Sequence, residues 1–299
     1  MNPKVTAIAE KLRVRFIDSI ATSNELYIFL CGGNSSGETK LRRQLGKEIG
    51  QISSKYTYFV YYPEDMFVEL ILGHQKEDLL SLENLLAESV HCVTILVQSP
   101  GTFTELGAFT NYEELQNKLL IVIDPKYSRS KSFISRGPVR YLQKRTNSQV
   151  IYSKLDSGNI PVLTRQITEA TRNIAKNSHP TFDLSNAIAA YRLVLALIYV
   201  FDPIGKNSIL EILTSMGANR QSINIIAETA INSLINEKKV TFSSGNLSIT
   251  DKGVNEITSD STKKRSSDTI RALSNLRLEA LNITLRKGYR KEWAGAIRA

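Results

Sequence analysis

The sequence predicts an α/β protein in which a doubly wound, Rossmann-like parallel-sheet domain precedes a mostly α-helical winged helix-turn-helix domain. Apolar runs that do not alternate with polar residues, separated by helical patterns, occur at 26–31, 56–62, 90–97 and 119–123. Such runs are typical of a parallel sheet that helices cover on both faces. From residue 184 onward helical segments dominate, followed by two short strand-like runs. This change of pattern predicts the second domain.

The elements of the first domain follow in order along the chain. The run Leu26–Cys31 ends in the loop Gly32-Gly33-Asn34-Ser35-Ser36-Gly37, and a helical pattern covers 38–52. Tyr56–Tyr62 is aromatic and β-branched, as strands prefer. Val90–Val97 and Leu119–Ile123 are typical of buried strands, and helical patterns at 79–89 and 104–118 precede them. We expect this domain to occupy residues 1–155.

The second domain begins with a long apolar helix at 184–201, which Asp202-Pro203 ends. Helices at 208–216 and 221–237 flank a turn, and strands at 240–243 and 247–250 flank Ser244-Gly245-Asn246. Two helices joined by a tight turn and followed by a β-hairpin have the order of a winged helix. We therefore expect a connector at 156–183, a winged-helix domain at 184–261, and a basic linker with a final helix (269–286) at 262–299.

Composition excludes several classes of protein. The 299 residues include two cysteines and three scattered histidines, so neither a disulfide framework nor a metal site is expected. The longest apolar stretch is nine residues, at 193–201, against about 20 needed to span a bilayer. We expect a cytoplasmic protein without a membrane anchor or a signal peptide.

The net charge of +9 is concentrated at the end of the sequence, because residues 262–299 hold ten basic and three acidic residues. A basic end on a nearly neutral body predicts contact with a polyanion, although a solvated segment without a partner is the alternative. The stretch 126–145 is a second basic surface, either a solvated connection or a phosphate or nucleic-acid contact. The candidate partner-binding residues near the end are Lys263, Lys264, Arg265, Arg271, Arg277, Arg286 and Lys287.

The Gly32-Gly33-Asn34 loop lies between the first strand and the following helix. Backbone N–H groups in such a position can bind a phosphate or a sugar. The loop lacks both the G-x-G-x-x-G pattern and the Gly-Lys-Ser/Thr of a P-loop, so a plain strand-to-helix turn is equally compatible with it.

A stronger candidate directly follows the strand at 90–97. There Ser99, Gly101 and Thr102 occupy the loop at the carboxyl edge of the sheet, where open α/β sheets bind ligands. We expect Glu105 in the first turn of the next helix, where the helix N-terminus stabilises a carboxylate. It could act as a nucleophile or as a charge partner for a cationic sugar. The alternative is that Glu105 only forms a capping box with Thr102.

Four strings carry a resemblance to a known family: the Gly-Gly loop, Tyr62-Pro63-Glu64-Asp65, LSLENLLAE at 80–88 and SPGTFTELGAF at 99–109. Together they resemble nucleoside 2-deoxyribosyltransferase-like proteins. With the winged helix added, the chain is similar to the effector proteins of bacterial retron anti-phage systems. The resemblance implies that Glu105 acts at the anomeric carbon and that Glu83 contacts the sugar hydroxyls.

One position departs from the family pattern. Enzymes of that family that act on nucleosides carry an Asp six residues before the nucleophile, and here that position is Ser99. A neutral base usually needs protonation to leave, whereas nicotinamide leaves NAD from a cationic ring without a proton. The departure favours NAD as a substrate, with no cofactor. Glu64 or Asp65 could still supply an acid, which leaves nucleosides open.

The retron resemblance implies a partner, the reverse transcriptase with its branched RNA–DNA product (msDNA), and a higher-order assembly. The predicted recognition helix, 221–237, contains no Lys or Arg, although phosphate contacts normally need several. Docking on a protein–nucleic-acid complex is therefore favoured over reading a duplex sequence. Three hypotheses follow: a toxin that hydrolyses NAD, a nucleoside or nucleotide deoxyribosyltransferase or N-glycosidase, and a non-enzymatic nucleotide sensor that binds DNA.

Overall fold

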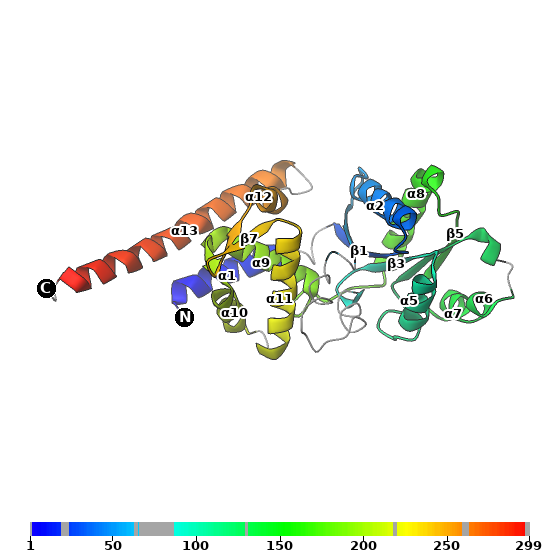
Figure 1. Ribbon diagram of the computed structural model, residues 1–299, viewed down its shortest axis with the longest axis horizontal. Coiled ribbons are helices and arrows are strands. Elements are labelled where there is room, and N and C mark those ends of the chain that lie inside the picture. The colour runs from blue at the N-terminus through cyan, green and yellow to red at the C-terminus, as the bar shows by residue number, and fades with distance from the viewer. Residues whose placement is uncertain are drawn as a thin grey trace. The chain divides into compact units, whose positions relative to one another are not determined.

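The structure is a computed structural model, and it describes residues 2–18, 24–62, 65, 87–128, 131–217, 220–258 and 263–296. For residues 145, 220–222, 263–267, 284 and 286–296 it describes the backbone alone. The chain forms two compact units, drawn in Figure 1. The sheet unit is Ser23–Thr181, and the helical unit combines Met1–Thr22 with Phe182–Ala299. These bounds differ from the predicted ranges, because the start of the chain joins the helical unit.

The sheet unit is built on five parallel strands in the order β2-β1-β3-β4-β5. Every residue of β1, β3 and β4 is buried, as a parallel sheet between two helical layers requires. Each of the four apolar runs forms a strand. The strands are β1 (Glu25–Cys31), β2 (Thr57–Tyr61), β3 (Cys92–Val97), β4 (Leu119–Ile123) and β5 (Gln149–Tyr152).

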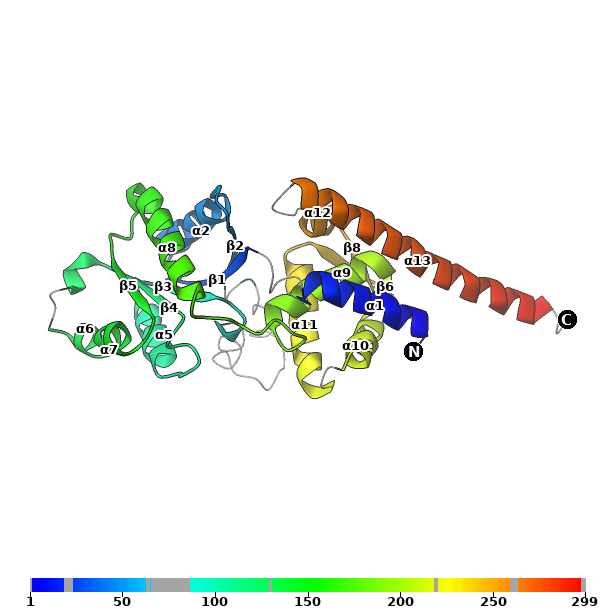
Figure 2. The ribbon, with the colours of Figure 1, turned by 180° about the vertical axis from the view of Figure 1, so that it is seen from behind.

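Helices cover both faces of this sheet, which confirms the doubly wound, Rossmann-like α/β class. Helices α2 (Ser36–Gly50) and α8 (Ile160–Ala175) lie on one face, and α5 (Pro100–Thr110) and α7 (Pro138–Arg145) on the other, as Figures 1 and 2 show from opposite sides. The core on the first face joins Leu45 of α2 and Ile167 of α8 to Ile28 of β1. Short helices complete the unit: η2 (Pro125–Tyr127), α6 (Phe133–Arg136) and η3 (Ser157–Asn159).

Three elements of the sheet unit differ from expectation. The predicted connector contains α8, whose buried residues pack against the sheet. The sequence patterns did not indicate β5, a four-residue strand at the edge of the sheet. Helix α5 spans Pro100–Thr110, although the helical pattern was placed at 104–118. The predicted helix at 79–89 lies mostly outside the described residues.

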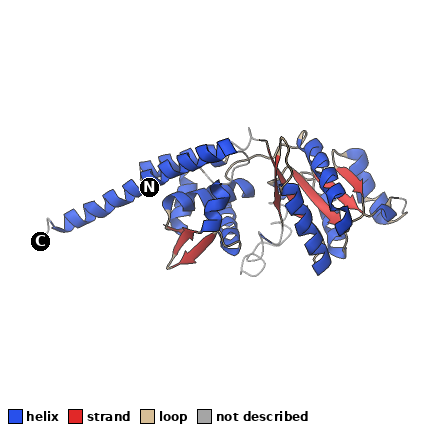
Figure 3. Ribbon diagram, turned by 90° about the horizontal axis from the view of Figure 1, so that it is seen from above, coloured by secondary structure: helices blue, strands red, loops and turns tan. Residues whose placement is uncertain are grey.

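The helical unit contains the predicted winged helix-turn-helix. Strand β6 pairs with β8, and β8 pairs with β7, so the wing has three strands. The hairpin of β7 and β8 is drawn in red in Figure 3. Gly245 has a φ of 82° and Ser244 a φ of 50°, the left-handed backbone that a tight hairpin turn needs. The elements are α1 (Pro3–Phe16), α9 (Ala187–Phe201), β6 (Ile204–Gly205), α10 (Lys206–Ser215), α11 (Arg220–Asn236), β7 (Val240–Ser243), β8 (Asn246–Ile249), α12 (Asp251–Thr258) and α13 (Lys263–Ala296).

Two terminal helices complete the helical unit. Helix α1 packs against α9, α10 and α13, and buries Ile8, Ala9, Leu12 and Phe16. Helix α13 spans Lys263–Ala296, so it begins within the predicted linker and extends well past the expected end at 286. Its buried side chains include Leu273 and Ala280, whereas Leu278 and Leu285 are exposed. One face of α13 therefore holds it on the unit while another faces solvent.

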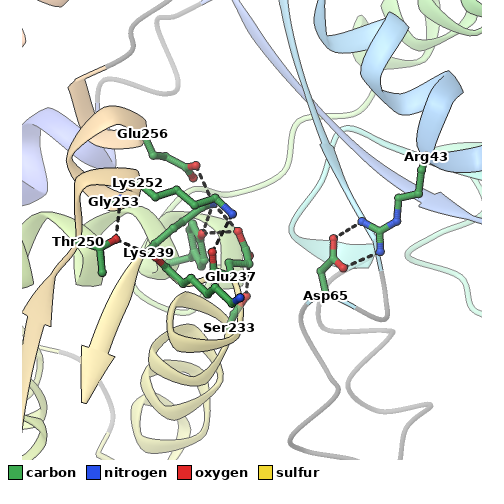
Figure 4. A network of polar contacts seen from close by, with 11 residues as sticks. Arg43, Asp65, Ser233, Glu237, Lys239, Thr250, Lys252, Gly253 and Glu256 are labelled. Carbon is green, nitrogen blue, oxygen red and sulfur yellow. Dashed lines mark hydrogen bonds and ion pairs between the residues drawn. The ribbon is translucent and has the colours of Figure 1, made fainter. Parts of the chain in front are cut away.

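A buried lysine in the turn between α11 and β7 contacts α9 and α12 (Figure 4). The side chain of Lys239, 9% exposed, forms ion pairs with Glu237 and with Glu256 of α12, at 2.6 Å for the latter. It also donates a hydrogen bond to the hydroxyl of Tyr191 on α9 (2.8 Å). Gly253 lets α12 approach closely, because a Cβ there would lie 2.3 Å from the carbonyl oxygen of Lys239. These contacts fix the wing against α9 and α12.

Candidate functional site

The strand order puts the topological switch point of the sheet at its carboxyl edge, between β1 and β3. From β1 the chain proceeds outward to β2 on one side, and from β3 outward to β4 and β5 on the other. In open α/β sheets, ligands bind at such a switch point. The loop after β1 lies beside β3, because a Cβ on Gly32 would lie 3.6 Å from the Cβ of Leu96. The sheet therefore brings the two predicted loops to one edge.

A buried arginine supports the Gly-Gly loop, and the sequence analysis missed it. The side chain of Arg42 is 2% exposed, and its Nη1 donates to the carbonyl oxygen of Gly32 at 2.9 Å. A Cβ on Gly32 would lie 2.9 Å from Cδ of Arg42, so glycine permits this approach. A signal was present, since Arg42 directly follows Leu41 in the apolar stripe of α2. The arrangement places a guanidinium under the loop.

The N-terminus of α2 is already capped by its own side chains. The backbone N–H of Ser35 donates to Glu38 Oε2 at 3.2 Å, and the N–H of Glu38 faces Ser35 Oγ at 3.4 Å. Gly33 lies against the same carboxylate, because a Cβ there would be 2.3 Å from Glu38 Oε2. A phosphate at this helix end would meet a negative charge. Glu38, which the sequence analysis did not single out, is instead suited to accept hydrogen bonds from sugar hydroxyls.

The loop after β3 is fixed by a second capping box. The Thr102 hydroxyl accepts hydrogen bonds from the N–H groups of Gln98 and Ser99, both at 3.0 Å, and donates to the carbonyl of Ser99 at 2.8 Å. Thr102 is buried, whereas Gly101 is exposed. Thr102 thus shapes the loop, while Gly101 and the partly exposed Ser99 are the predicted residues of this loop that a ligand can reach.

Glu105 lies one turn further along α5 than expected. The helix begins at Pro100 with Ser99 as its N-cap, so Glu105 is in the second turn, and the capping box is formed by Ser99 and Thr102. The first-turn placement and the capping-box alternative for Glu105 are both wrong. The dipole of α5 stabilises the carboxylate less than in the first turn. Oε2 of Glu105 is buried, and the residue as a whole is partly exposed.

Asp65 is held by α2 at the same edge of the sheet. Its two carboxylate oxygens receive hydrogen bonds from Nη1 and Nη2 of Arg43 at 2.5 and 2.6 Å (Figure 4). The Arg43 guanidinium stacks over the ring of Tyr62, 4.0 Å from its centroid. Asp65 therefore belongs to a two-point ion pair in the described structure. The other two predicted carboxylates, Glu64 and Glu83, lie outside the described residues.

Perturbed pKa values cluster at the opposite, amino edge of the sheet. Burial, together with the positive charge of Lys118, lowers the pKa of His91 to about 4. Burial lowers the pKa of Lys118 to about 8, and its Nζ donates to the carbonyls of Glu88 (2.9 Å) and Val90 (3.4 Å). A hydrogen bond to Glu88 raises the pKa of Tyr112 to about 12. These groups satisfy buried backbone and side-chain polar atoms away from the switch point.

Metal-binding clusters, reactive thiols and membrane-spanning helices would be other signs of function. There, no group of three or more His, Cys, Asp or Glu side chains is placed to hold a metal ion. Cys31 and Cys92 are buried free thiols, and burial raises the pKa of Cys92 to about 11. None of the helices within the described ranges combines the length and the hydropathy needed to cross a membrane.

The described side chains of α11, the predicted recognition helix, offer no basic surface for a duplex. Among the described side chains of α11, the exposed ones are Asn224, Glu228 and Asn236. Arg277, a predicted partner contact, instead pairs with Asp202 at 3.0 Å and stacks over the ring of Tyr199.

The other predicted basic contacts lie along α13. Arg271 on this helix is exposed. For Lys263, Lys264, Arg265, Arg286 and Lys287 the structure describes the backbone alone.

Comparison with known proteins adds a family. A family model described as "STM3845 retron effector protein" matches residues 38–274. The chain is 31% identical over 277 residues to an Escherichia coli protein named "Retron Ec86 putative ribosyltransferase/DNA-binding protein", covering 88% of this chain and 86% of that protein. It is 27% identical over 218 residues to the "Retron Ec73 putative ribosyltransferase/DNA-binding protein" of Escherichia coli, covering 64% and 66% respectively.

Proposed function

The chain belongs to the STM3845 retron effector protein family, and from this premise we propose that it is an anti-phage effector whose sheet unit cleaves an N-glycosidic bond in NAD. The observation that carries the proposal is the position of Glu105, on the helix that directly follows β3 at the topological switch point. The names of the two Escherichia coli relatives, which include ribosyltransferase, support glycosyl-transfer chemistry. Binding of the reverse transcriptase and msDNA is part of the same proposal.

In the proposed reaction, the Glu105 carboxylate faces the anomeric carbon of the ribose attached to nicotinamide. The bond between this carbon and the pyridinium nitrogen breaks, and its electron pair neutralises the ring, which leaves as nicotinamide. Water supplies the hydroxyl of the ADP-ribose product and releases one proton. Glu105 stabilises the oxocarbenium-like centre by its charge or by a transient covalent bond. A carboxylate with one buried oxygen is partly shielded from water, which strengthens this electrostatic effect.

The remaining substrate contacts are assigned by chemistry. Glu83 is proposed to hold the ribose hydroxyls, as the resemblance implies, and the Glu38 carboxylate beside Gly33 is a second acceptor for hydroxyl groups. The buried Arg42 guanidinium holds this loop in place, because its Nη1 donates to the carbonyl oxygen of Gly32. We therefore assign Gly32, Gly33 and Asn34 to the sugar, and Ser99, Gly101 and Thr102 in the loop after β3 to the pyrophosphate.

Two observations favour NAD over nucleosides. Ser99 occupies the position where the nucleoside-cleaving enzymes of the resembled family carry an Asp, so the loop lacks a carboxylic acid that could protonate a leaving base. Asp65, a candidate replacement, is engaged in a two-point ion pair with Arg43, and protonating it would give up that pair. A leaving group that needs no proton fits this site better.

The experiment is nicotinamide release from NAD by the purified protein, alone and with its retron reverse transcriptase and msDNA. We expect Glu105→Gln to slow release by at least about 100-fold, because the substitution removes the charge that stabilises the transition state. Glu113→Gln, at an exposed position after α5, is the matched control and should keep the wild-type rate.

Equal rates for Glu105→Gln and the wild-type protein would overturn the assignment of Glu105. Release of free base from deoxynucleosides, with no turnover of NAD, would support a nucleoside deoxyribosyltransferase or N-glycosidase. Saturable NAD binding without turnover, together with a footprint on one duplex sequence, would support a DNA-binding sensor.

A further inference from the structure

A basic groove crosses the sheet unit between α5 and the α6–α7 segment. Its volume is about 920 Å³, and it is lined by Gly107 and Thr110 of α5 and by Phe133, Arg136 and Arg140 on the other side. Lys144 extends the same side of the groove. The groove belongs to a single unit, so its walls are formed by neighbouring elements of one fold.

The charged side chains that line this groove are all positive among the described residues. Arg136, Arg140 and Lys144 are exposed, and none of the described residues that line the groove is acidic. Arg140 and Lys144 are four residues apart on α7, a rise of about 6 Å, which is on the order of one nucleotide of an extended strand. The three side chains can therefore follow successive phosphates of one strand.

An aromatic side chain stands at the end of this row. Phe133 is 83% exposed, more than any other large hydrophobic side chain among the described residues. Phe133 is the first residue of α6, directly after the N-cap Ser132, and lies one turn before Arg136. A basic groove combined with an exposed aromatic ring is the arrangement on which single-stranded nucleic acids bind, because the bases stack on the ring while the phosphates meet the cations.

Hydrogen bonds through Gln116 link the two sides of the groove. The Tyr141 hydroxyl donates to Gln116 Oε1 at 3.2 Å, and Gln116 Nε2 donates to the carbonyl of Thr110 at 3.0 Å. A Cβ on Gly107 would meet no atom within 4 Å, so the α5 wall is open at this point. The open space at Gly107 leaves room for a nucleic-acid backbone to lie along α5.

This groove is separate from the candidate catalytic site. Gly107 follows Glu105 by two residues on α5, which turns its direction by about 200° around the helix axis. The buried residue between them, Leu106, faces the interior. Glu105 and the groove therefore lie on opposite flanks of α5, and substitutions in the groove leave the carboxylate in place.

We propose that the α5–α7 groove binds single-stranded nucleic acid, with Arg136, Arg140 and Lys144 on the phosphates and Phe133 stacked on a base. The site gives the sheet unit a nucleic-acid contact of its own, in addition to the basic α13. A binding measurement tests it independently of the proposed NAD cleavage, because binding at this groove requires no turnover.

The test uses fluorescence anisotropy of the full-length protein with a labelled 15-nucleotide single strand and with the matching duplex. Phe133→Ala should weaken single-strand binding roughly 5- to 100-fold, since stacking on one base is worth that much. The triple variant R136Q/R140Q/K144Q should weaken binding and reduce the slope of log affinity against log salt by about 2. The control K47Q/K154Q/R165Q removes the same charge at exposed positions of the same unit and should stay within about threefold of wild type.

Photocrosslinking of a 5-iodouridine strand then locates the contact. Crosslinks on the peptide that contains Phe133 would support the proposal. Wild-type affinity of Phe133→Ala, equal effects of the two triple variants, equal affinity for strand and duplex, or crosslinks confined to α13 would each overturn it.

Discussion

At the scale of single residues, His91 links acidity to the stability of the sheet unit. Its Nδ1 accepts a hydrogen bond from the N–H of Tyr27 at 3.1 Å, and its ring stacks on that of Tyr27. Burial lowers its pKa from 6.5 to about 4, helped by Lys118 and His179 and opposed by Glu25. Between these two values the unfolded chain binds the proton more readily. The stabilisation by neutral His91 is therefore complete above pH 6.5 and is lost as the pH falls toward 4.

His91→Asn should flatten this dependence, because an amide oxygen can keep the hydrogen bond from Tyr27 without titrating. Between pH 7 and 4.5 the wild-type sheet unit should lose on the order of 2 kcal/mol more unfolding free energy than the variant. Urea unfolding followed by circular dichroism at each pH measures the difference. Parallel profiles for the two proteins would show that His91 does not carry the effect.

The sequence predicted the positions of some single residues and not of others. Glu105 was placed on the correct helix, but the helix start was missed by four residues, because the pattern at 104–118 did not weigh Ser99-Pro100 as an N-cap followed by a proline at the first position. Arg42 was missed because a charged residue is expected at the surface, whereas this guanidinium is satisfied under the Gly-Gly loop. The locations of Glu64 and Glu83 stay predictions.

At the scale of elements, burial on both faces decided which parts of the fold were predictable. The strands β1, β3 and β4 are buried throughout, so their apolar runs were unambiguous. Edge strand β5 is partly exposed and short, which left no such run. Helix α8 places Thr164, Thr168 and Thr171 on its buried face, and these residues hid the apolar stripe. The wing was predictable because its turn needs residues such as Ser244-Gly245.

We expect substitutions on the two faces of α13 to change the unfolding free energy by different amounts. Leu273 is 0% exposed and Leu278 is 60% exposed on the same helix. Leu273→Ala should lower the unfolding free energy of the helical unit by about 2–4 kcal/mol, because it leaves a cavity, and Leu278→Ala by less than about 0.5 kcal/mol. Chemical denaturation of the two variants checks the contrast. Equal losses would mean that Leu278 is covered in solution.

At the scale of the whole molecule, the sheet unit is inserted into the sequence of the helical unit, because α1 precedes it and α9 to α13 follow it. Helix α1 packs on α9, although about 170 residues separate them. The predicted boundary at residue 1 missed this arrangement, because the apolar stripe of α1 does not say which later segment covers it. The consequence is that a defect in α1 should affect the end of the chain and leave the intervening sheet unit intact.

Leu12→Ala and Leu163→Ala form a matched pair for this test, since both side chains are 0% exposed. Leu12→Ala, on α1, should speed hydrogen exchange in α9 and α11 and leave β1 and β3 unchanged. Leu163→Ala, on α8, should speed hydrogen exchange in β1 and β3 and leave α9 and α11 unchanged. Each change should cost about 2–4 kcal/mol in its own unit. Faster exchange in the sheet after Leu12→Ala would contradict the division into these two units.

The pairing of α1 with α9 also has a consequence for synthesis on the ribosome. The apolar face of α1 is made first, and its main partner emerges only after the entire sheet unit has been translated. At about 5–20 residues per second, this delay is roughly 10–30 seconds. The sheet unit, with its candidate catalytic site, can therefore fold on the nascent chain before the helical unit is complete. A nascent chain that stops before α9 would carry the sheet unit without a complete helical unit.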